Sequence, residues 1–495
     1  MRICELIRPL MLYKTTGDLM TEIHGIQIDS RQVQPGDLFI ALRGTQVDAH
    51  RFVEQAVANG AAAVMVEKPV DLPGIPVIQV PDTRRAMAVV AAKFYHYPTK
   101  ELKLIGVTGT NGKTTTTYLI EQLLRHKGSL TGVIGTIQTK IGKKKFATKN
   151  TTPEVTDLQK TFRMMKDEGC EYSVIEVSSH ALDMGRTRGC QFRIAVFTNL
   201  TQDHLDYHET MENYREAKSL LFSQLGNAYA EDLEDNTFAV FNADDKASGY
   251  FMQRTPAQVI TYGIEQPADV TAENIRFSSS GTTFTLKTFR GEVPIRSRLV
   301  GKFNVYNVLA AVSVALIEGM DLKQIQTALA EVEGISGRFE PVDLGQPYSV
   351  LVDYAHTPDS LENALTTIRE FAKGRVICIV GCGGDRDRSK RPLMAEIAVK
   401  NSDLAIFTSD NPRTENPVTI LDDMLVGVDQ YPEDRYLVIE NRKEAIYEAV
   451  AKAKPEDVIL IAGKGHETYQ EINGVRHHFD DREVAADAIR SMRAK

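Results

Sequence analysis

One stretch, Leu102–Thr117, constrains the fold of this chain more than any other part of the sequence. It begins with an apolar run rich in β-branched residues, which is typical of a buried parallel strand, and a turn with Gly109 and Gly112 follows. Lys113 and Thr114 begin a predicted helix. In such a unit the turn amides and the helix N-terminus face an anion, the lysine supplies a positive charge, and the threonine hydroxyl can ligate Mg²⁺. The stretch therefore predicts a phosphate-binding loop for ATP.

The spacing of this loop departs from that of the standard P-loop. The standard pattern needs a glycine at position 107, where this chain has Val107, and the glycine is Gly106 instead. An ordinary glycine-rich turn between strand and helix is the alternative. Gly-Lys-Thr at the start of a helix favours the ATP site.

Length and composition limit the class of protein. A chain of 495 residues is too long for one hydrophobic core, and about 150 residues per domain suggests about three domains. A net charge of −8 argues against a general binder of nucleic acid or of membrane surfaces, and no apolar run approaches the ~18 residues of a membrane span. The five cysteines form no CxxC pair and the N-terminus lacks a secretory apolar region, so we expect reduced thiols in a cytoplasmic protein.

The order of predicted elements indicates an α/β protein with three domains. Residues 101–335 alternate strands with helices, which predicts a doubly wound, mostly parallel sheet around the P-loop. Residues 336–495 repeat the alternation as a Rossmann-like α/β domain, and residues 1–100 form a smaller α/β domain. The lysine run at 143–145 is expected in a solvated loop, and Pro153 near the first position of a helix.

Three side chains in the central region are candidates for metal chemistry. Glu176 ends an apolar strand and could hold Mg²⁺ together with Thr114, or be a hydrogen-bonded acid at a strand end. His204 and His208 are four residues apart, but without an HExxH pattern or a cysteine partner they do not predict zinc. A single His204 ligand to Mg²⁺ or Mn²⁺ and a structural histidine both remain open. Lys218, taken alone, is typical of a solvated helical lysine.

A second group of candidates follows the strands of the C-terminal region. The sequence Asp410-Asn-Pro-Arg413 places an anion, an amide and a guanidinium within four residues at a predicted strand end. The arginine fork matches a carboxylate, and Asp and Asn can accept from an ammonium group. An Asx-Pro turn is the alternative. Arg386 and Glu467 in neighbouring loops repeat the same chemistry and favour a site for the zwitterionic end of an amino acid.

Six motifs, which follow one another along the chain, indicate a known family. They are Thr108–Thr115, Glu176–His180, Thr198–Asp206, Phe303–Ala310, Gly337–Glu340 and Asp353–Pro358. Together they resemble the Mur ligases, the ATP-dependent amide ligases of peptidoglycan precursor synthesis and cell-wall biogenesis, and the resemblance spans nearly the whole chain. Asp29–Arg31 and Asp410–Arg413 look most like the members that add the third residue of the peptide. The Asp-Asn-Pro-Arg form is similar to that of ligases using meso-2,6-diaminopimelate rather than L-lysine.

The resemblance implies a specific reaction. In it, ATP activates the D-Glu side-chain carboxylate of UDP-N-acetylmuramoyl-L-alanyl-D-glutamate as an acyl phosphate, and meso-2,6-diaminopimelate attacks it, giving the amide, ADP and phosphate. The same ligation with L-lysine and a folylpolyglutamate-type ligase are the alternatives. We expect a monomer that binds no nucleic acid and uses ATP and Mg²⁺. Residues 1–100 would bind the UDP-sugar, residues 101–335 ATP and residues 336–495 the amino acid.

The resemblance also assigns residues. Those expected at ATP are Gly109, Thr110, Asn111, Gly112, Lys113, Thr114, Thr115, Asn307 and Arg338. The expected metal ligands are Thr114, Glu176, His204 and Lys218, the last as a carbamate, and the expected catalytic group is Lys113, Lys218, His204 and Glu176. Those expected at the UDP-sugar dipeptide are Ser30, Thr45, Gln46, Val47, Asn150, Thr151, Thr152, Ser178, Met184 and Arg186. Those expected at the amino acid are Arg386, Asp410, Asn411, Pro412, Arg413, Gly463 and Glu467. Two positions depart from the family pattern: Met184 replaces a frequent glutamine, and Ala49 a usual glycine.

Overall fold

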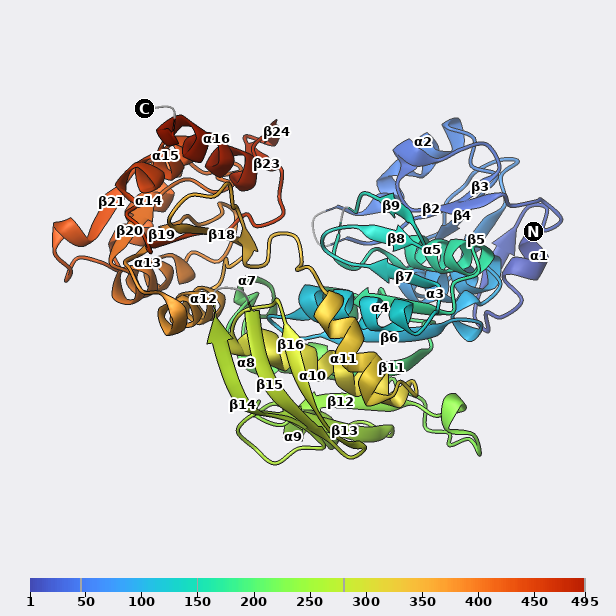
Figure 1. Cartoon of the computed structure of the whole chain (residues 1–495). Helices are drawn as coiled ribbons and strands as arrows, with labels where there is room; N and C mark the ends of the chain where they lie inside the picture. The colour runs from blue at the N-terminus through green and yellow to red at the C-terminus, as the bar shows by residue number, and fades with distance from the viewer. Residues whose placement is uncertain (45–46, 149, 279–280, 494–495) are drawn as a thin grey trace.

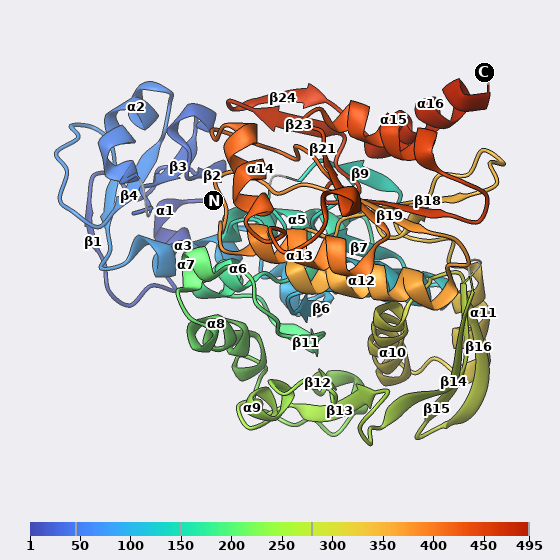
Figure 2. The ribbon, with the colours of Figure 1, turned by 90° about the vertical axis from the view of Figure 1, so that its left-hand side faces the viewer.

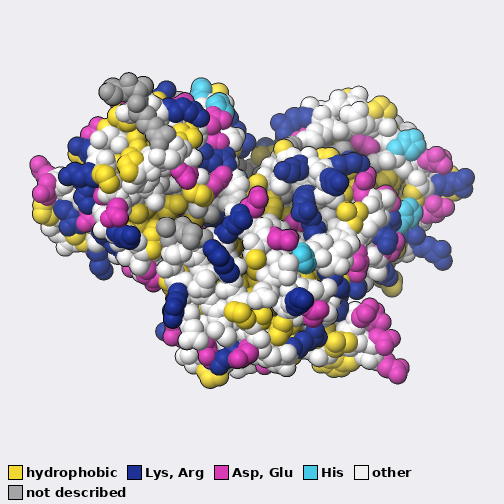
Figure 3. Space-filling model, in the orientation of Figure 1, with side chains coloured by type: hydrophobic (Ala, Val, Ile, Leu, Met, Phe, Trp, Pro, Cys, Tyr) yellow, Lys and Arg dark blue, Asp and Glu magenta, His cyan; other side chains and the backbone are white. Residues whose placement is uncertain are grey.

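Three separate sheets, each with a parallel core, succeed one another along the chain (Figure 1). The computed structural model describes residues 1–44, 47–148, 150–278 and 281–493. We call residues 1–100, 101–335 and 336–495 the N-terminal, central and C-terminal parts. Figure 1 shows the N-terminal and C-terminal parts on the same side of the central part, facing each other, and Figure 3 shows a notch between them. Acidic and basic side chains are interspersed over the face in Figure 3.

The N-terminal part has a five-stranded sheet in the order β1-β5-β4-β3-β2, parallel except for the antiparallel edge strand β1. Its strands are β1 (Lys14–Thr16), β2 (Gly25–Gln27), β3 (Asp37–Ile40), β4 (Ala63–Val66) and β5 (Val77–Gln79). Its helices are α1 (Ile3–Leu6), α2 (Val53–Ala58) and α3 (Thr83–Phe94). β3 and β4 are buried along their whole length, as is typical of parallel strands covered on both faces.

The central part is built on an eleven-stranded sheet in the order β16-β15-β14-β13-β12-β11-β6-β10-β7-β8-β9. Its strands are β6 (Lys103–Thr108), β7 (Thr131–Ile134), β8 (Thr139–Ile141), β9 (Lys144–Phe146), β10 (Tyr172–Glu176), β11 (Phe192–Phe197), β12 (Phe238–Asn242), β13 (Gln258–Gly263), β14 (Val270–Ser278), β15 (Gly281–Thr288) and β16 (Gly291–Ser297). Its helices are α4 (Lys113–His126), α5 (Val155–Asp167), α6 (Ser179–Asp183), α7 (Leu205–His208), α8 (Met211–Ser223), α9 (Ser248–Met252), α10 (Lys302–Ile317) and α11 (Leu322–Glu331). The P-loop strand β6 lies between β11 and β10, near the middle of the sheet.

The C-terminal part has a six-stranded sheet in the order β17-β18-β22-β19-β20-β21, with the edge strand β17 antiparallel, and a separate hairpin. The sheet strands are β17 (Glu340–Pro341), β18 (Ser349–Asp353), β19 (Val376–Val380), β20 (Leu404–Phe407), β21 (Tyr436–Val438) and β22 (Val458–Ala462). The hairpin strands are β23 (Tyr469–Ile472) and β24 (Val475–His478). The helices are α12 (Pro358–Phe371), α13 (Lys390–Asn401), α14 (Pro417–Leu425), α15 (Arg442–Lys452) and α16 (Asp481–Arg493). Helix α12 lies next to the central part in both orthogonal views (Figures 1 and 2) and contacts β14.

The predicted α/β class with a mostly parallel P-loop sheet is confirmed, and several local predictions are corrected. Lys144 and Lys145 of the lysine run belong to the strand β9, which is exposed but paired with β8, so the run is not a loop throughout. Helix α5 begins at Val155 after the N-cap Glu154, so Pro153 precedes the helix. The antiparallel strands β14–β16 were not predicted; one face of them packs on α10 and α11. None of the helices in the described ranges is long and apolar enough to cross a membrane.

Candidate functional site

The P-loop follows β6 directly, and its two glycines are sterically required. Gly109 has φ +150° and Gly112 has φ +84°, which favour glycine. A Cβ atom on Gly109 would lie 1.9 Å from Thr198 Oγ1, and one on Gly112 would lie 2.4 Å from Asn307 Oδ1. Gly112 is the N-cap of α4, so the loop amides and the helix N-terminus point to the same space.

Two lysine amines converge on one carbonyl of this loop. Lys113 Nζ donates to the Gly109 carbonyl (2.9 Å) and to the Thr110 carbonyl (2.7 Å), and Lys218 Nζ donates to the Gly109 carbonyl (2.8 Å). Lys218 lies on α8 with only 1% of its surface exposed. Its pKa is well below the usual value because it is buried and because Lys113 lies nearby. The interpretation of Lys218 as a solvated lysine, which its helical context alone favours, is therefore wrong.

The carboxylate of Glu176, at the end of β10, contacts the hydroxyl of Thr114 in the first turn of α4. Thr114 Oγ1 donates to Glu176 Oε2 over 2.8 Å, and Glu176 is fully buried. Thr136 donates to the same carboxylate through its amide (2.9 Å) and its hydroxyl (3.0 Å). Oxygen ligands of this kind suit Mg²⁺. No group of three or more His, Cys, Asp or Glu side chains converges on one point in the described ranges, so Mg²⁺ here would need further ligands from phosphate and water.

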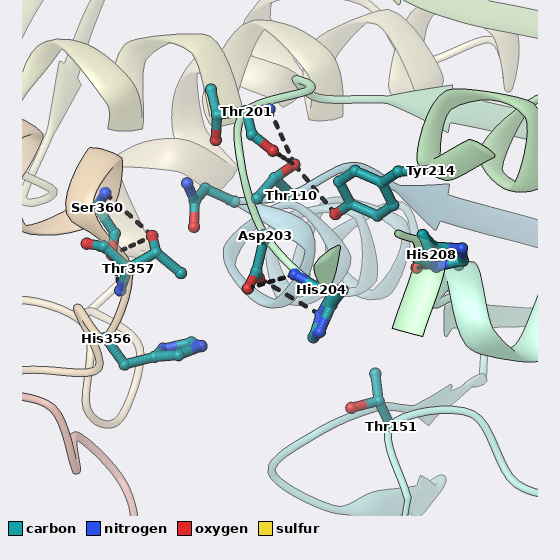
Figure 4. A network of polar contacts seen from close by, with 12 residues as sticks. Thr110, Thr151, Thr201, Asp203, His204, His208, Tyr214, His356, Thr357 and Ser360 are labelled. Atoms are coloured by element: carbon teal, nitrogen blue, oxygen red, sulfur yellow. Dashed lines mark hydrogen bonds and ion pairs between the residues drawn. The ribbon is translucent and has the colours of Figure 1, made fainter. Parts of the chain in front are cut away.

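His204 lies beside the P-loop in a left-handed conformation, with φ 56°, as the residue preceding α7 (Figure 4). Burial lowers the pKa of His204 to about 3 although the Asp203 carboxylate, 3.4 Å from its Nε2, opposes the shift. His208 instead lies in the protein interior, where its Nε2 is 2.9 Å from Ser179 Oγ. The two histidines therefore do not form a common metal site. Figure 4 shows the ring of His356, from the C-terminal part, pointing toward Asp203 and His204.

A cavity of about 350 Å³ lies between the P-loop and the C-terminal part. Asn307 from α10 and Arg338 from the chain segment joining the two parts both line it, together with the P-loop residues Asn111, Gly112 and Thr115. Arg338 Nη2 is 3.5 Å from Thr114 Oγ1, and its guanidinium carbon lies 4.8 Å from the Tyr354 ring centroid. The size of this cavity is typical of small-molecule sites.

The C-terminal loops form a second polar cluster. Asn411 Nδ2 donates to Glu467 Oε2 (2.8 Å). A Cβ atom on Gly463 would lie 2.5 Å from Asp410 Oδ2, so Gly463 and Asp410 are in close contact. Burial and the nearby Asp410 raise the pKa of Glu467. Arg413 Nη1 donates to the Gly384 carbonyl (2.8 Å). A Cβ on Gly383 would lie 2.8 Å from Arg413 Nη1 and 3.9 Å from Arg386 Cγ, so both side chains lie close to Gly383 on the same side.

Comparison with known proteins assigns this combination of sites to a family. Residues 22–95 match the model of the Mur ligase family catalytic domain, residues 107–315 that of the Mur ligase middle domain, and residues 337–465 that of the Mur ligase glutamate ligase domain. This chain belongs to the Mur ligase family. The family resemblance of the sequence motifs is confirmed.

Individual relatives and one solved structure match over nearly the whole chain. The UDP-N-acetylmuramoyl-L-alanyl-D-glutamate--2,6-diaminopimelate ligase of Bacillus cereus is 55% identical over 468 residues, which cover 94% of each chain. The ligase of the same name from Halalkalibacterium halodurans is 55% identical over 489 residues, or 99% of each chain. A solved structure of a ligase of this name is 35% identical, covers 100% of this chain and 99% of its own, and superposes with a TM-score of 0.70.

The residues that the sequence predicts at the UDP-sugar dipeptide of this Mur ligase fall into two groups. Thr151, Thr152, Ser178 and Arg186 lie together near Glu176: Thr152 Oγ1 accepts from the Ser178 amide (3.0 Å), and Arg186 Nη1 donates to the Thr152 carbonyl (3.1 Å). Met184 Sδ accepts from Arg186 Nη2 (3.5 Å). Ser30 lies apart, bonded to Gln55 and Asn59 of the N-terminal part, while Val47 and Asn150 are exposed. Thr45 and Gln46 lie outside the described residues.

Sequence reasoning missed three charged residues that hold these sites in place. Arg84 on α3 donates from Nη1 to Glu154 Oε2 (3.2 Å) and to the Met184 carbonyl (3.3 Å), which joins the N-terminal and central parts. Lys464 is fully buried and donates to Asn411 Oδ1 (3.0 Å). Arg442 is fully buried, 4.0 Å from Asp410 Oδ2. Lys464 follows Gly463 within a predicted polar loop, which was a usable signal; Arg84 and Arg442 carry none, because each lies in an ordinary helix.

Proposed function

We propose that this chain is an ATP-dependent ligase that joins meso-2,6-diaminopimelate to the D-Glu side-chain carboxylate of UDP-N-acetylmuramoyl-L-alanyl-D-glutamate in peptidoglycan precursor synthesis. The observation that carries the proposal is 55% identity, over 94% of each chain, to a ligase named for that reaction. Two arrangements support it: the P-loop beside the Thr114–Glu176 pair, and the Asp410–Arg413 loop at the carboxyl end of β20.

The three parts of the chain suit the three substrates. We assign residues 1–100 to the UDP-sugar, residues 101–335 to ATP and residues 336–495 to the amino acid. At ATP we place the P-loop from Gly109 to Thr115 with Asn307 and Arg338, which line the cavity beside it. At the UDP-sugar dipeptide we place Ser30, Thr45, Gln46, Val47, Asn150, Thr151, Thr152, Ser178, Met184 and Arg186. At the amino acid we place Arg386, Asp410, Asn411, Pro412, Arg413, Gly463 and Glu467.

The reaction proceeds in two steps. The γ-phosphate passes to the D-Glu carboxylate, which gives an acyl phosphate and ADP, and the diaminopimelate amine then attacks the acyl carbon and expels phosphate. Lys113 and the N-terminal amides of α4 stabilise the negative charge that develops on the transferring phosphoryl group. No protein nucleophile is needed, since the protein acts by positioning and by electrostatics.

The residues around the P-loop fit a divalent cation. Thr114 and Glu176 offer oxygen ligands, and bound Mg²⁺ would supply further neutralisation of phosphate charge. His204 offers a neutral imidazole, since its pKa is about 3. Lys218 has the depressed pKa that a neutral amine requires, and a neutral amine is the form that can add CO₂ to give a carbamate oxygen ligand. We therefore assign His204 and carbamylated Lys218 to a second Mg²⁺.

Phosphate release with each substrate omitted in turn tests the proposal. We expect release only when ATP, UDP-N-acetylmuramoyl-L-alanyl-D-glutamate and meso-diaminopimelate are all present, and loss of release when Mg²⁺ is chelated. Equal rates with L-lysine would identify the lysine-adding reaction. Release with a folate and glutamate would identify a folylpolyglutamate-type ligase, and release without any amino acid would contradict ligase activity.

Two further assignments follow from the substrates. A UDP-sugar and ATP are supplied in the cytoplasm, so we propose that the enzyme acts there. That the enzyme is a monomer stays a prediction, which sedimentation of the full chain would test.

A further inference from the structure

The loop that we assign to the incoming amino acid is held by a hairpin outside the sheet of the C-terminal part. The strands β23 and β24 pair only with each other among the described strands, through a turn at Asn473 (φ 49°) and Gly474 (φ 76°). Figures 1 and 2 place this hairpin on the side of the C-terminal part that faces the N-terminal part. None of residues 469–478 belongs to a hydrophobic core cluster of the described chain.

Four hydrogen bonds connect the hairpin to the Asp410–Arg413 loop. The Arg413 amide donates to the Glu471 carbonyl (3.0 Å), and the Asn473 amide donates to the Arg413 carbonyl (2.6 Å). Gln470 Nε2 donates to the Asp410 carbonyl (2.7 Å), and the Glu471 amide donates to Asn411 Oδ1 (2.9 Å). Asp410, Asn411 and Arg413 are thus each held from the same hairpin.

These four hydrogen bonds determine where the guanidinium of Arg413 lies. Arg413 has φ 52°, a left-handed conformation that is unfavourable for a residue with a side chain and persists only where its surroundings hold it. Its amide and carbonyl are both bonded to the hairpin, and its side chain then reaches the Gly384 carbonyl (2.8 Å). A shift in the backbone here would move the guanidinium relative to Arg386, whose side chain also lies beside Gly383.

We propose that the hairpin β23–β24 is the element that sets selectivity for the acceptor amino acid, with Gln470 as its positioning residue. This inference rests on the proposed function. The hairpin acts by fixing the loop, so that the guanidinium of Arg413 meets the distal carboxylate of a diamino dicarboxylic acid. A two-stranded hairpin is marginally stable alone, so the same four hydrogen bonds also hold the hairpin in place.

Gln470→Glu and Gly474→Val test the proposal in the full-length enzyme. The first removes the amide donor and places a carboxylate at the Asp410 carbonyl. The second strains the turn at φ 76° without a clash, since nothing lies within 4 Å of a Cβ at Gly474. We expect either variant to raise the KM for meso-diaminopimelate about tenfold, the value of one hydrogen bond, and to reduce its preference over L-lysine. The KM values for ATP and for the UDP-sugar dipeptide should stay unchanged.

His477→Ala is the matched control, because His477 is exposed on β24 directly opposite Gln470. It should behave as the wild type. Hydrogen exchange of residues 410–414 gives a readout that needs no activity, and it should be faster in Gln470→Glu than in His477→Ala.

Unchanged exchange in this loop, an unchanged KM for meso-diaminopimelate, or a parallel rise in all three KM values would overturn the proposal. A wild-type enzyme that ignores meso-diaminopimelate would contradict the proposed function instead, and the exchange measurement would still decide whether the hairpin holds the loop.

Discussion

Asn111 of the P-loop donates a hydrogen bond of 2.7 Å to Asp359 on α12, which lies 248 residues further along the chain. Both residues line the cavity of about 350 Å³ beside the P-loop. Burial raises the pKa of Asp359. The contact joins the central part to the C-terminal part across the proposed ATP site, so the position of α12 and the shape of the P-loop depend on each other.

Replacing Asp359 should therefore weaken the use of ATP. Asp359→Ala leaves the Asn111 amide without its carboxylate partner, and a hydrogen bond to a charged group contributes about 1.5–3 kcal/mol, or about tenfold to a hundredfold in kcat/KM for ATP. Asp359→Asn keeps an oxygen acceptor and should lose less. Steady-state kinetics with varied ATP measure the effect, and an Asp359→Ala enzyme with wild-type kcat/KM would show that the contact is not used in catalysis.

Lys218 should be required for activity but not for folding. Lys218→Ala removes an amine that donates to the Gly109 carbonyl and that we assign to the second Mg²⁺. We expect most activity to be lost, an unchanged circular dichroism spectrum, and partial recovery with added short-chain carboxylic acids, whose oxygens can replace those of a carbamate. Full activity of Lys218→Ala without added acid would rule out the carbamate.

Arg413 should discriminate between amino acids. Its fork is expected to bind the distal carboxylate of diaminopimelate, a group that lysine lacks, and loss of such a charge-assisted contact costs about 1.5–3 kcal/mol. Arg413→Ala should therefore reduce the preference for diaminopimelate over lysine about tenfold to a hundredfold, as measured by the ratio of the two kcat/KM values. If the ratio stays as in the wild type, another residue recognises that carboxylate.

Stability should fall as the pH falls from about 6.5 to about 4. Burial lowers the pKa of His208 and His356 to about 4 and that of His466 to about 3, from a usual value of 6.5. In this window the unfolded chain binds more protons than the native chain, so each histidine lowers the free energy of unfolding by up to about 1.4 kcal/mol per pH unit. Urea unfolding at a series of pH values measures the slope. His208→Gln should give a shallower slope, and a flat curve for the wild type would contradict the assignment of neutral buried histidines.

The ion pair of Arg442 and Asp481 should be a large stability determinant. Both side chains are fully buried, and Arg442 donates to Asp481 through Nε (2.8 Å) and Nη2 (2.7 Å). Arg442→Met leaves a buried carboxylate unpaired, which costs about 3–5 kcal/mol. Urea unfolding should show this loss, and Arg442→Met combined with Asp481→Leu should regain part of it. A loss of less than about 1 kcal/mol would mean that the pair behaves like an exposed one.

Much of the site could be predicted because its signals are local. β6, the glycine turn and α4 are continuous in sequence, and each needs only apolar periodicity, two glycines and a helix start. Residues at strand ends, such as Glu176 and Asp410, could also be placed near a site, since the carboxyl ends of parallel strands meet at one edge of a sheet. The helix start after Pro153 was placed two residues early, because cap geometry decides such a boundary.

The amino-acid sequence by itself determined the α/β class, the position of the P-loop and the family, because each of these depends on neighbouring residues or on the order of motifs along the chain. Only the tertiary structure decided that the Lys218 amine is buried against the Gly109 carbonyl, that Asn111 contacts Asp359, and that Gln470 holds the Asp410 carbonyl. The physical reason is that burial, pKa and hydrogen bonding depend on which distant segments pack against a side chain, and a helical lysine or a hairpin glutamine has the same local sequence whether it faces solvent or another part of the chain.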